Sequence, residues 1–356
     1  MESEKITSVE EYSNIVIVQT AFAGDLILTI PVAQVLKRIN PSSQIDMVVI
    51  PRTADILMNH PDINKVIIYD KNGKDAGFRG LLRLSRVLRE NRYDLAIVPH
   101  RSLRSALLVK FAGVKRRIGF DKSTGKWFFT DIVHYEPYAH EINRNISLLT
   151  KLDWNNDDLV YPRLFPSFHD RKKVSHFLTE NGIQHTNQLI AVAPGSVWNT
   201  KRWLKEGFIE LVDKLTAKGF HVILIGGSDD AELCKQIYLS VPSKNVYSAA
   251  GKFTFLQSAE LISRCKLLVS NDSAPMHIAC AVRTPVVAIF GATSPQFGFA
   301  PFGEHNVVVE TLGLSCRPCS IHGTEKCPIG TFDCMKRITS DHVLNKVLSL
   351  LNQQGK

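Results

Sequence analysis

The sequence predicts an α/β protein built from two doubly wound, mostly parallel sheets. Short apolar runs alternate with amphipathic segments along the whole chain. The runs IVIV, VVI and LAIV are continuously apolar, which is typical of strands covered by helices on both faces. At 356 residues the chain exceeds what one hydrophobic core usually serves, so we expect two domains.

The first half of the chain alternates strands and helices. We expect strands at 14–19, 44–50, 66–69 and 95–98, and helices at 25–39, 54–58, 78–90 and 103–111. The segment 155–167 holds Pro162 and Pro166 and lacks helical periodicity, which favours a linker. The predicted domains are therefore 1–165 and 166–356.

The second half restarts the same alternation. We expect strands at 189–193, 222–225, 267–270 and 286–290, and helices at 171–180, 207–217, 231–239, 256–264, 276–282 and 341–351. The last helix is a candidate for packing back toward the first domain. Such sheets bind ligands at the carboxyl ends of their strands, which predicts a cleft between the two domains.

Composition narrows the class of protein. With 44% hydrophobic and 22% charged residues the chain is typical of a globular protein. No secretory signal and no membrane-spanning run is expected, so we predict a cytoplasmic location. The seven cysteines are expected to be reduced. The net charge is +9, and residues 79–126 hold thirteen Lys and Arg against three acids. An anionic partner and a merely solvated face explain this basic stretch about equally well.

The segment after the first strand, TAFAGD, carries Asp25 at the start of a helix. It has only Gly24 where a dinucleotide site needs the G-x-G-x-x-G pattern, which disfavours a nicotinamide enzyme. From composition alone, Asp25 is either a helix N-cap or a carboxylate that faces the cleft.

The segment PGSVWNTKRW follows a predicted buried strand. Small hydrogen-bonding residues there precede Lys201 and Arg202, as a phosphate-binding loop would require. A polar loop with solvent-facing cations is the alternative.

The segment VSNDSAPMH ends another predicted strand and begins a helix. Asp272 or Ser273 can cap this helix, and Pro275 suits its first turn. Such a helix start can bind a diphosphate, although a well-made cap explains the same residues. Gly226 and Gly227 end a neighbouring strand and could admit a ligand or simply turn the chain.

Four cysteines, Cys316, Cys319, Cys327 and Cys334, lie close together near the carboxyl end. Four thiols could form a zinc site, but the spacing of the last two is longer than in the usual paired knuckle. We therefore favour packed thiols and expect no metal.

Together these segments resemble glycosyltransferase family 9, which contains the lipopolysaccharide heptosyltransferases. The resemblance extends from Ile15 to about Leu351. AFAGDLILTIPVAQVLK is similar to the family's opening motif, PGSVWNTKRW to its phosphate loop, and NDSAPMHIACAVRTPVVAIFGATSP to its carboxyl-terminal signature. The cysteine-rich stretch is similar to that of the heptosyltransferase II branch.

The resemblance implies a GT-B fold, with two Rossmann-like domains facing a central cleft. Domain 1–165 would bind the acceptor and domain 166–356 the nucleotide sugar. Asp25 matches the general base, and Lys201 matches the residue that contacts the donor phosphates. The other residues implied for the donor are Ser196, Thr200, Gly226, Asp272, Ser273, Ala274 and His277, and those implied for the acceptor are His100, Arg101 and Arg117.

The activity implied by the resemblance is inverting, metal-independent transfer of heptose from ADP-L-glycero-D-manno-heptose. The acceptor would be a phosphorylated lipid A–Kdo–heptose core at the inner face of the inner membrane. No cofactor and no nucleic acid partner is implied, and domain closure would exclude water.

Several alternatives stay open at this point. The enzyme could use another nucleotide sugar, add the first heptose, or epimerise or hydrolyse its donor. A non-catalytic nucleic-acid binder would also explain the basic region, but the chain carries no recognisable nucleic-acid module.

Overall fold

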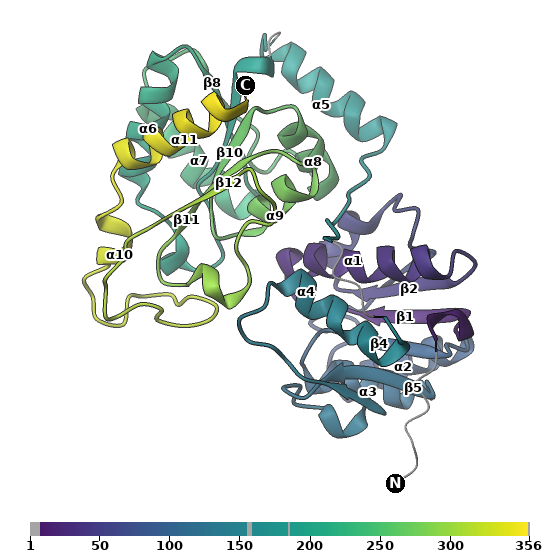
Figure 1. Cartoon of the computed structure of the whole chain (residues 1–356). Coiled ribbons are helices and arrows are strands. Elements are labelled where there is room, and N and C mark those ends of the chain that lie inside the picture. The colour runs from purple at the N-terminus through teal and green to yellow at the C-terminus, as the bar shows by residue number, and fades with distance from the viewer. Residues whose placement is uncertain (1–7, 155–158, 184–185, 355–356) are drawn as a thin grey trace. The chain divides into compact units, whose positions relative to one another are not determined.

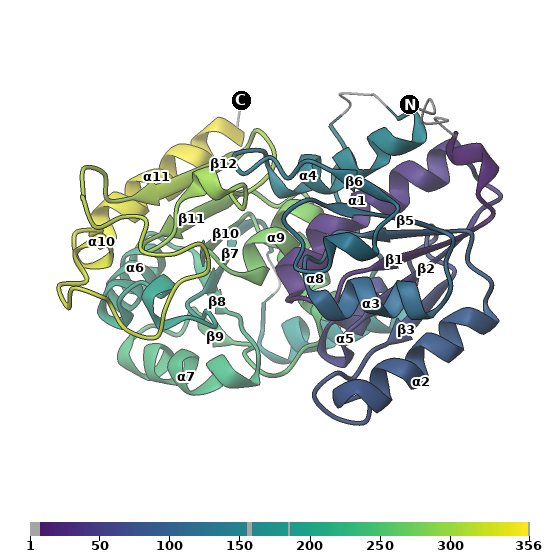
Figure 2. The same ribbon diagram turned by 90° about the horizontal axis from the view of Figure 1, so that it is seen from below.

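The computed structural model describes residues 8–154, 159–183 and 186–354. The chain divides into two compact units, Met1–Phe165 and Pro166–Lys356. Residues 155–158 of the predicted linker lie outside the described residues. Each unit is an α/β domain with helices on both faces of its sheet (Figures 1 and 2).

The first unit contains a six-stranded parallel sheet in the order β3-β2-β1-β4-β5-β6. Helices α1 and α4 pack together on one face, and α2 and α3 on the other. The strands are β1 (Asn14–Val18), β2 (Gln44–Val49), β3 (Lys65–Ile68), β4 (Leu95–Val98), β5 (Arg116–Phe120) and β6 (Asp131–Val133), and the helices are α1 (Ala23–Ile39), α2 (Gly77–Glu90), α3 (Leu103–Phe111) and α4 (Glu141–Ile146).

The second unit repeats this arrangement, with the strand order β12-β11-β10-β7-β8-β9. The strands are β7 (Leu189–Ala193), β8 (His221–Leu224), β9 (Val246–Ser248), β10 (Leu267–Asn271), β11 (Val286–Phe290) and β12 (Asn306–Glu310). The helices are α5 (Phe168–Glu180), α6 (Lys205–Ala217), α7 (Ala231–Ser240), α8 (Phe255–Ser263), α9 (Ala274–Ala281), α10 (Asp333–Lys336) and α11 (Ser340–Gln354).

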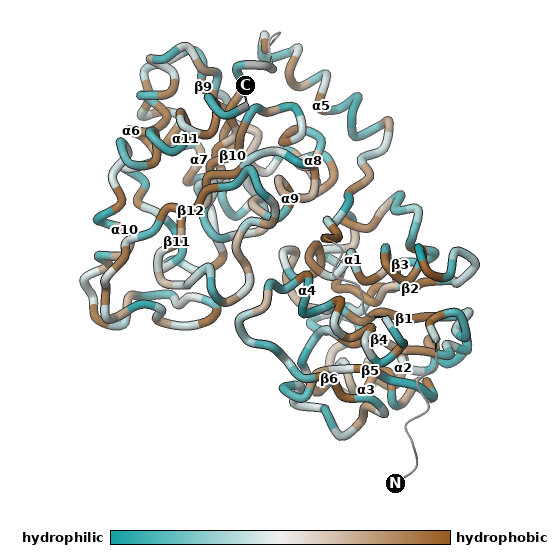
Figure 3. The backbone as a smooth tube through the Cα atoms, in the orientation of Figure 1, coloured by the Kyte–Doolittle hydropathy of each residue, from teal (hydrophilic) through white to brown (hydrophobic). Residues whose placement is uncertain are grey.

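The predicted fold class is confirmed. Residues of β1, β4, β7, β10 and β11 are almost all fully buried, as continuously apolar strands between two helical layers must be. Figure 3 follows these strands as apolar segments inside each unit. The edge strands β6, β9 and β12 and the inner strand β5 were not predicted. β6 and β9 have three residues each, β5 begins with two arginines, and β12 is largely half-buried.

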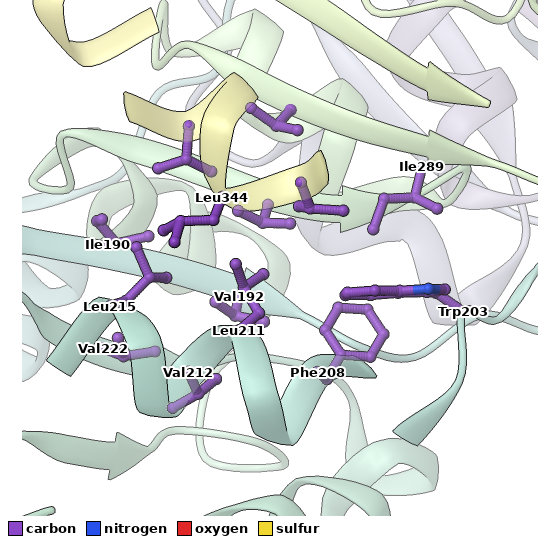
Figure 4. Close-up of a cluster of buried hydrophobic side chains, with 14 of the residues drawn as sticks. Ile190, Val192, Trp203, Phe208, Leu211, Val212, Leu215, Val222, Ile289 and Leu344 are labelled. Carbon is purple, nitrogen blue, oxygen red and sulfur yellow. The ribbon is translucent and has the colours of Figure 1, made fainter. Parts of the chain in front are cut away.

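The last helix, α11, packs into the core of the second unit. Val343, Leu344, Val347 and Leu350 of α11 join the same buried cluster as α6 and β7 (Figure 4). The sequence left open whether this helix packs toward the first unit, and its apolar face lies in the core of the second.

Each sheet reverses its winding once. The reversal lies between β1 and β4 in the first unit and between β7 and β10 in the second. Loops that leave the carboxyl ends of these strands diverge at such a point, so the sheet itself provides a place for a ligand. The segments singled out from the sequence follow three of these four strands.

Candidate active site

Asp25 lies in the first turn of α1, at the carboxyl edge of the first sheet. Phe22 is the N-cap residue of this helix, so the capping interpretation of Asp25 is wrong. The Thr29 hydroxyl donates to the Asp25 backbone carbonyl at 2.8 Å and accepts from the Gln19 amide at 2.9 Å. These contacts fix the start of α1 against the end of β1, while the Asp25 side chain stays half-exposed.

His100 follows β4 and lies beside the end of β1. Its Nδ1 is 2.9 Å from the Thr20 hydroxyl and 2.8 Å from that of Ser105. Burial, together with the positive charges of Lys71 and Arg101, lowers the pKa of His100 to about 4. The imidazole is therefore neutral at pH 7, and it can donate or accept a hydrogen bond without adding charge.

Arg101 lies against an aromatic ring that follows β6. The guanidinium carbons of Arg101 and Arg144 each lie 4.3 Å from the centroid of the Tyr135 ring. Arg144 is fully buried and donates to Glu141 at 2.6 Å. The pKa of Glu141 is raised to about 7, chiefly by burial and also by the negative charge of Asp25, while the positive charges of Arg144 and Arg101 oppose the rise.

These contacts bring Asp25, Arg101 and Glu141 into one electrostatic neighbourhood at the carboxyl edge of the first sheet. Lys71, after β3, joins the same edge, because its ammonium donates to the Thr20 carbonyl at 2.7 Å.

Arg117 is not brought into this neighbourhood. It is the second residue of β5, near the amino end of the strand. Its guanidinium donates to the carbonyls of Phe128 (2.7 Å), Lys115 (2.9 Å) and Val114. These bonds occupy the side chain in holding the loop around β5, so we do not retain Arg117 as an acceptor residue.

The predicted phosphate loop follows β7 and is held by a buried asparagine. The Asn271 side chain donates to the Pro194 carbonyl at 2.8 Å and accepts from the Trp203 backbone N–H at 3.0 Å. Ser196 is buried, and its carbonyl accepts from Arg202 at 2.7 Å. The end of β10 thus fixes both ends of the loop.

Lys201 and Asp272 form an ion pair at the point where the second sheet reverses. Lys201 Nζ lies 2.7 Å from Asp272 Oδ2, with 15% and 6% of the two side chains exposed. The Thr293 hydroxyl donates to the same Oδ2 at 2.7 Å. A carboxylate repels a phosphate, so we infer that Asp272 orients Lys201 rather than contacting an anion itself.

The helix α9 starts directly after Asp272. Ser273 is its N-cap by position, but its hydroxyl makes no capping bond to the helix and instead lies 3.4 Å from the Asn271 carbonyl. Ala274 is the first helical residue, and His277 is buried in the helix. The first-turn N–H groups and the helix dipole therefore favour an anion beside Lys201.

Gly226 is required by close packing at the end of β8. A Cβ atom there would lie 2.7 Å from Asp230 Cβ, and one on Gly195 of the phosphate loop would lie 2.0 Å from an Asp230 oxygen. The two glycines let Asp230 approach the loop, so Gly226 shapes this edge of the sheet through its lack of a side chain.

All seven cysteines are free thiols. Within the ranges 8–154, 159–183 and 186–354, no group of three or more His, Cys, Asp or Glu side chains is arranged to hold a metal ion. Over the same ranges, no helix is long and apolar enough to cross a membrane.

Two six-stranded parallel sheets in one chain, each with helices on both faces, are the arrangement of a GT-B-type glycosyltransferase. The sequence model described as glycosyltransferase family 9 (heptosyltransferase) matches residues 81–328. The chain belongs to this family, which confirms both the resemblance and the predicted enzyme class.

Relatives of known name agree with this assignment. Lipopolysaccharide heptosyltransferase 3 of Escherichia coli K12 is 31% identical over 80% of this chain and 84% of its own. Lipopolysaccharide heptosyltransferase 2 of Salmonella typhimurium is 27% identical over 96% and 99%. A glycosyl transferase family 9 structure from Veillonella parvula superposes with a TM-score of 0.87 at 25% identity, covering 96% and 98%. The E. coli ADP-heptose heptosyltransferase II structure superposes with a TM-score of 0.79 at 25% identity, covering 96% and 100%.

Several site residues were missed by sequence reasoning. Lys71 follows β3, Tyr135 follows β6, and Glu141 is the first residue of α4. Lys71 follows a strand that was predicted, so the rule that ligands bind at strand ends could have found it. Tyr135 could not be found this way, because β6 itself was not predicted. Asn271 lies within a recognised motif, but it holds the phosphate loop through contacts with residues distant in the sequence, which the motif does not show.

Proposed function

We propose that the enzyme transfers heptose from ADP-heptose to a phosphorylated lipid A–Kdo–heptose core in lipopolysaccharide synthesis. The first unit would bind the acceptor and the second the nucleotide sugar. The observation that carries the proposal is the matched placement of Asp25 and Lys201, each at the carboxyl edge of its sheet in a chain of this family.

The donor half of the reaction uses Lys201 and the start of α9. When the acceptor oxygen attacks the anomeric carbon, the bond from that carbon to the diphosphate oxygen breaks, and ADP leaves with added negative charge. Lys201, oriented by Asp272, and the first-turn N–H groups of α9 would stabilise that charge.

The acceptor half uses Asp25 as general base. Its carboxylate would take the proton of the attacking hydroxyl, and the sugar configuration would invert because attack is opposite to the leaving group. Lys71 and Arg101 supply positive charge at the same edge, which suits a phosphorylated acceptor. Neutral His100 can hydrogen-bond a sugar hydroxyl there.

The heptosyltransferase II assignment is the finer part of the proposal. It is supported by end-to-end similarity to heptosyltransferase 2, whereas heptosyltransferase 3 is more identical over a shorter part of this chain. Acceptors that end in one heptose or in two would separate these subtypes.

We also propose that the first unit docks on the inner face of the inner membrane. Trp127 and Tyr138, on the loops after β5 and β6, are 79% and 75% exposed, and residues 79–126 are strongly basic. Aromatic rings with nearby cations favour an anionic lipid surface. Trp127→Ser should reduce cosedimentation with anionic vesicles; unchanged binding would argue against this orientation.

The experiment that tests the proposed function measures ADP release from ADP-heptose with a heptose-bearing lipid A core. We expect acceptor-dependent release in wild type and a loss of at least a hundredfold in Asp25→Asn, which keeps the size of the side chain but cannot take a proton. Folding of the variant is checked by circular dichroism. Release by wild type without acceptor would indicate a hydrolase, and no release with retained ADP binding would mean that the donor sugar or acceptor is wrong.

A further inference from the structure

The segment between Cys319 and Cys327, residues 320–326, lies directly against the phosphate loop; we call it the cysteine-bounded loop. The Thr200 backbone N–H donates to the Thr324 carbonyl at 3.1 Å, and the Thr200 hydroxyl donates to the same carbonyl at 2.8 Å. The Thr324 N–H in turn donates to the Thr200 hydroxyl at 2.8 Å. Thr200 is 3% exposed, so its hydroxyl is used by Thr324 and is turned away from solvent.

Contacts on both sides of Thr200 extend this attachment. The Asn199 side chain donates to Glu325 at 3.0 Å. A Cβ atom on Gly323 would lie 2.9 Å from Lys201 Cγ and 3.0 Å from Trp198 Cβ, so the bare backbone of Gly323 packs on the stem of Lys201. Gly323 has a φ of +89°, a conformation that glycine adopts readily.

The same segment also supports the partner of Lys201. Arg317, just before the cysteine-bounded loop, donates to the Thr293 carbonyl at 2.8 Å, and the Cys319 N–H donates to the Ala292 carbonyl at 2.8 Å. Thr293 is the residue whose hydroxyl holds Asp272. Both members of the Lys201–Asp272 pair are therefore held from one stretch of chain.

From these contacts we propose that the cysteine-bounded loop is a positioning element for Lys201, and that Thr200 is a positioning residue rather than a donor ligand. The loop fixes the backbone of residues 199–201 through Thr324 and limits the Lys201 stem through Gly323. Lys201 is thereby held in one orientation before a diphosphate arrives, which lowers the entropy lost on binding. This inference rests on the proposed function, because it assigns the donor phosphates to Lys201.

The chain offers a matched pair of glycines for the test. Gly323 and Gly330 both have positive φ, at +89° and +76°, so alanine strains the backbone at either position. A Cβ atom on Gly330 meets nothing within 4 Å, whereas one on Gly323 displaces Lys201. Comparing Gly323→Ala with Gly330→Ala thus separates displacement of Lys201 from loop strain.

We expect Gly323→Ala to weaken ADP binding by tenfold or more in titration calorimetry and to raise the KM for ADP-heptose. The KM for the acceptor should not change, and Gly330→Ala should match wild type in both. Thr200→Val should weaken ADP binding similarly, with Thr200→Ser restoring it because serine keeps the hydroxyl that bonds Thr324. Hydrogen exchange at the Thr200 amide, which needs no ligand, should rise in Gly323→Ala.

The outcomes are separable. If Thr200 contacts the donor directly, Thr200→Val weakens binding while Gly323→Ala equals Gly330→Ala, and the positioning role is wrong. Normal ADP binding by Thr200→Val would overturn it as well. Wild type that binds neither ADP nor ADP-heptose would overturn the proposed function, and unchanged Thr200 exchange in Gly323→Ala would overturn the attachment itself.

Discussion

Burial of two histidines in the first unit gives the protein an acid-sensitive component. His60 and His100 both have their pKa lowered to about 4, mainly by burial and secondly by nearby positive charge. The folded state therefore resists a proton that the unfolded chain binds below about pH 6.5. The contribution of these two histidines to the free energy of unfolding is therefore fully present above pH 6.5. It is lost as the pH falls from 6.5 to 4.

His60→Asn should make the acid limb of stability shallower. Asparagine does not titrate, yet it keeps an oxygen near the Nδ1 that accepts from the Asp62 N–H. One such histidine contributes up to about 1.4 kcal/mol per pH unit between its two pKa values. Urea unfolding at pH 7, 6 and 5 measures this slope. His134→Asn is the control, because its side chain is 70% exposed; equal slopes in all three proteins would contradict the assignment.

At the scale of elements, the loop after β6 is tied to α4 through one buried arginine. Arg144 donates to the carbonyl of Ala139 at 2.6 Å and to that of Pro137 at 3.3 Å, besides its bond to Glu141. Helix α4, which also packs on α1, thus holds the loop that carries Tyr135. Because Arg101 lies against the Tyr135 ring, this loop in turn positions Arg101. Such contacts offset the desolvation penalty of a fully buried charge.

Arg144→Met should destabilise the protein by about 3–5 kcal/mol, because it leaves Glu141 buried without its partner. The loss should be larger at pH 8 than at pH 5. The pKa of Glu141 is raised to about 7, so its neutral form is favoured in the fold, and this contribution is lost as the pH rises through 7. At pH 5 the unpaired carboxyl can simply take a proton.

Chemical denaturation at both pH values measures this effect. Arg337→Met is the control, because Arg337, the C-cap residue of α10, forms a largely exposed pair with Asp333 whose loss costs about 0.5 kcal/mol or less. A penalty for Arg144→Met that is the same at pH 5 and pH 8 would mean that Glu141 does not take up a proton there.

The elements also show how far sequence reasoning reaches. Long apolar strands and the helices between them were predicted because their periodicity is local. Arg117 and Thr200 were assigned to ligands from motif position alone, yet the side chains bond to loop carbonyls and to Thr324, respectively. Contacts between segments more than a hundred residues apart, such as Thr200 with Thr324, leave no local pattern in the sequence.

At the scale of the whole molecule, two sheets of the same strand order have separate cores. One core joins β7, β8 and β10 with α6, α7 and α11, and another joins β1, β2 and β4 with α2 and α3. A ligand whose contacts lie in one unit therefore stabilises that unit directly.

ADP should slow hydrogen exchange mainly in the second unit, at 194–203 and 271–277. At a concentration a hundred times its Kd, the ligand adds about 2.7 kcal/mol to the stability of the unit that binds it. Exchange in β1, β4 and α1 should change much less. Equal protection of both units would contradict assignment of the nucleotide to residues 166–356, and mass spectrometry of peptic peptides gives the measurement.

The cysteine-bounded loop ends at a thiol that suits optical detection of donor binding. Burial raises the pKa of Cys327, but hydrogen bonds from the N–H groups of Phe332, Ile329, Gly330 and Thr331 together lower it below the ordinary value for a thiol. Cys234, Cys265 and Cys280 are buried, and burial raises their pKa. A maleimide dye should therefore react with Cys327 before these three. The dye would sit three residues from Thr324, where its emission could follow nucleotide binding in real time.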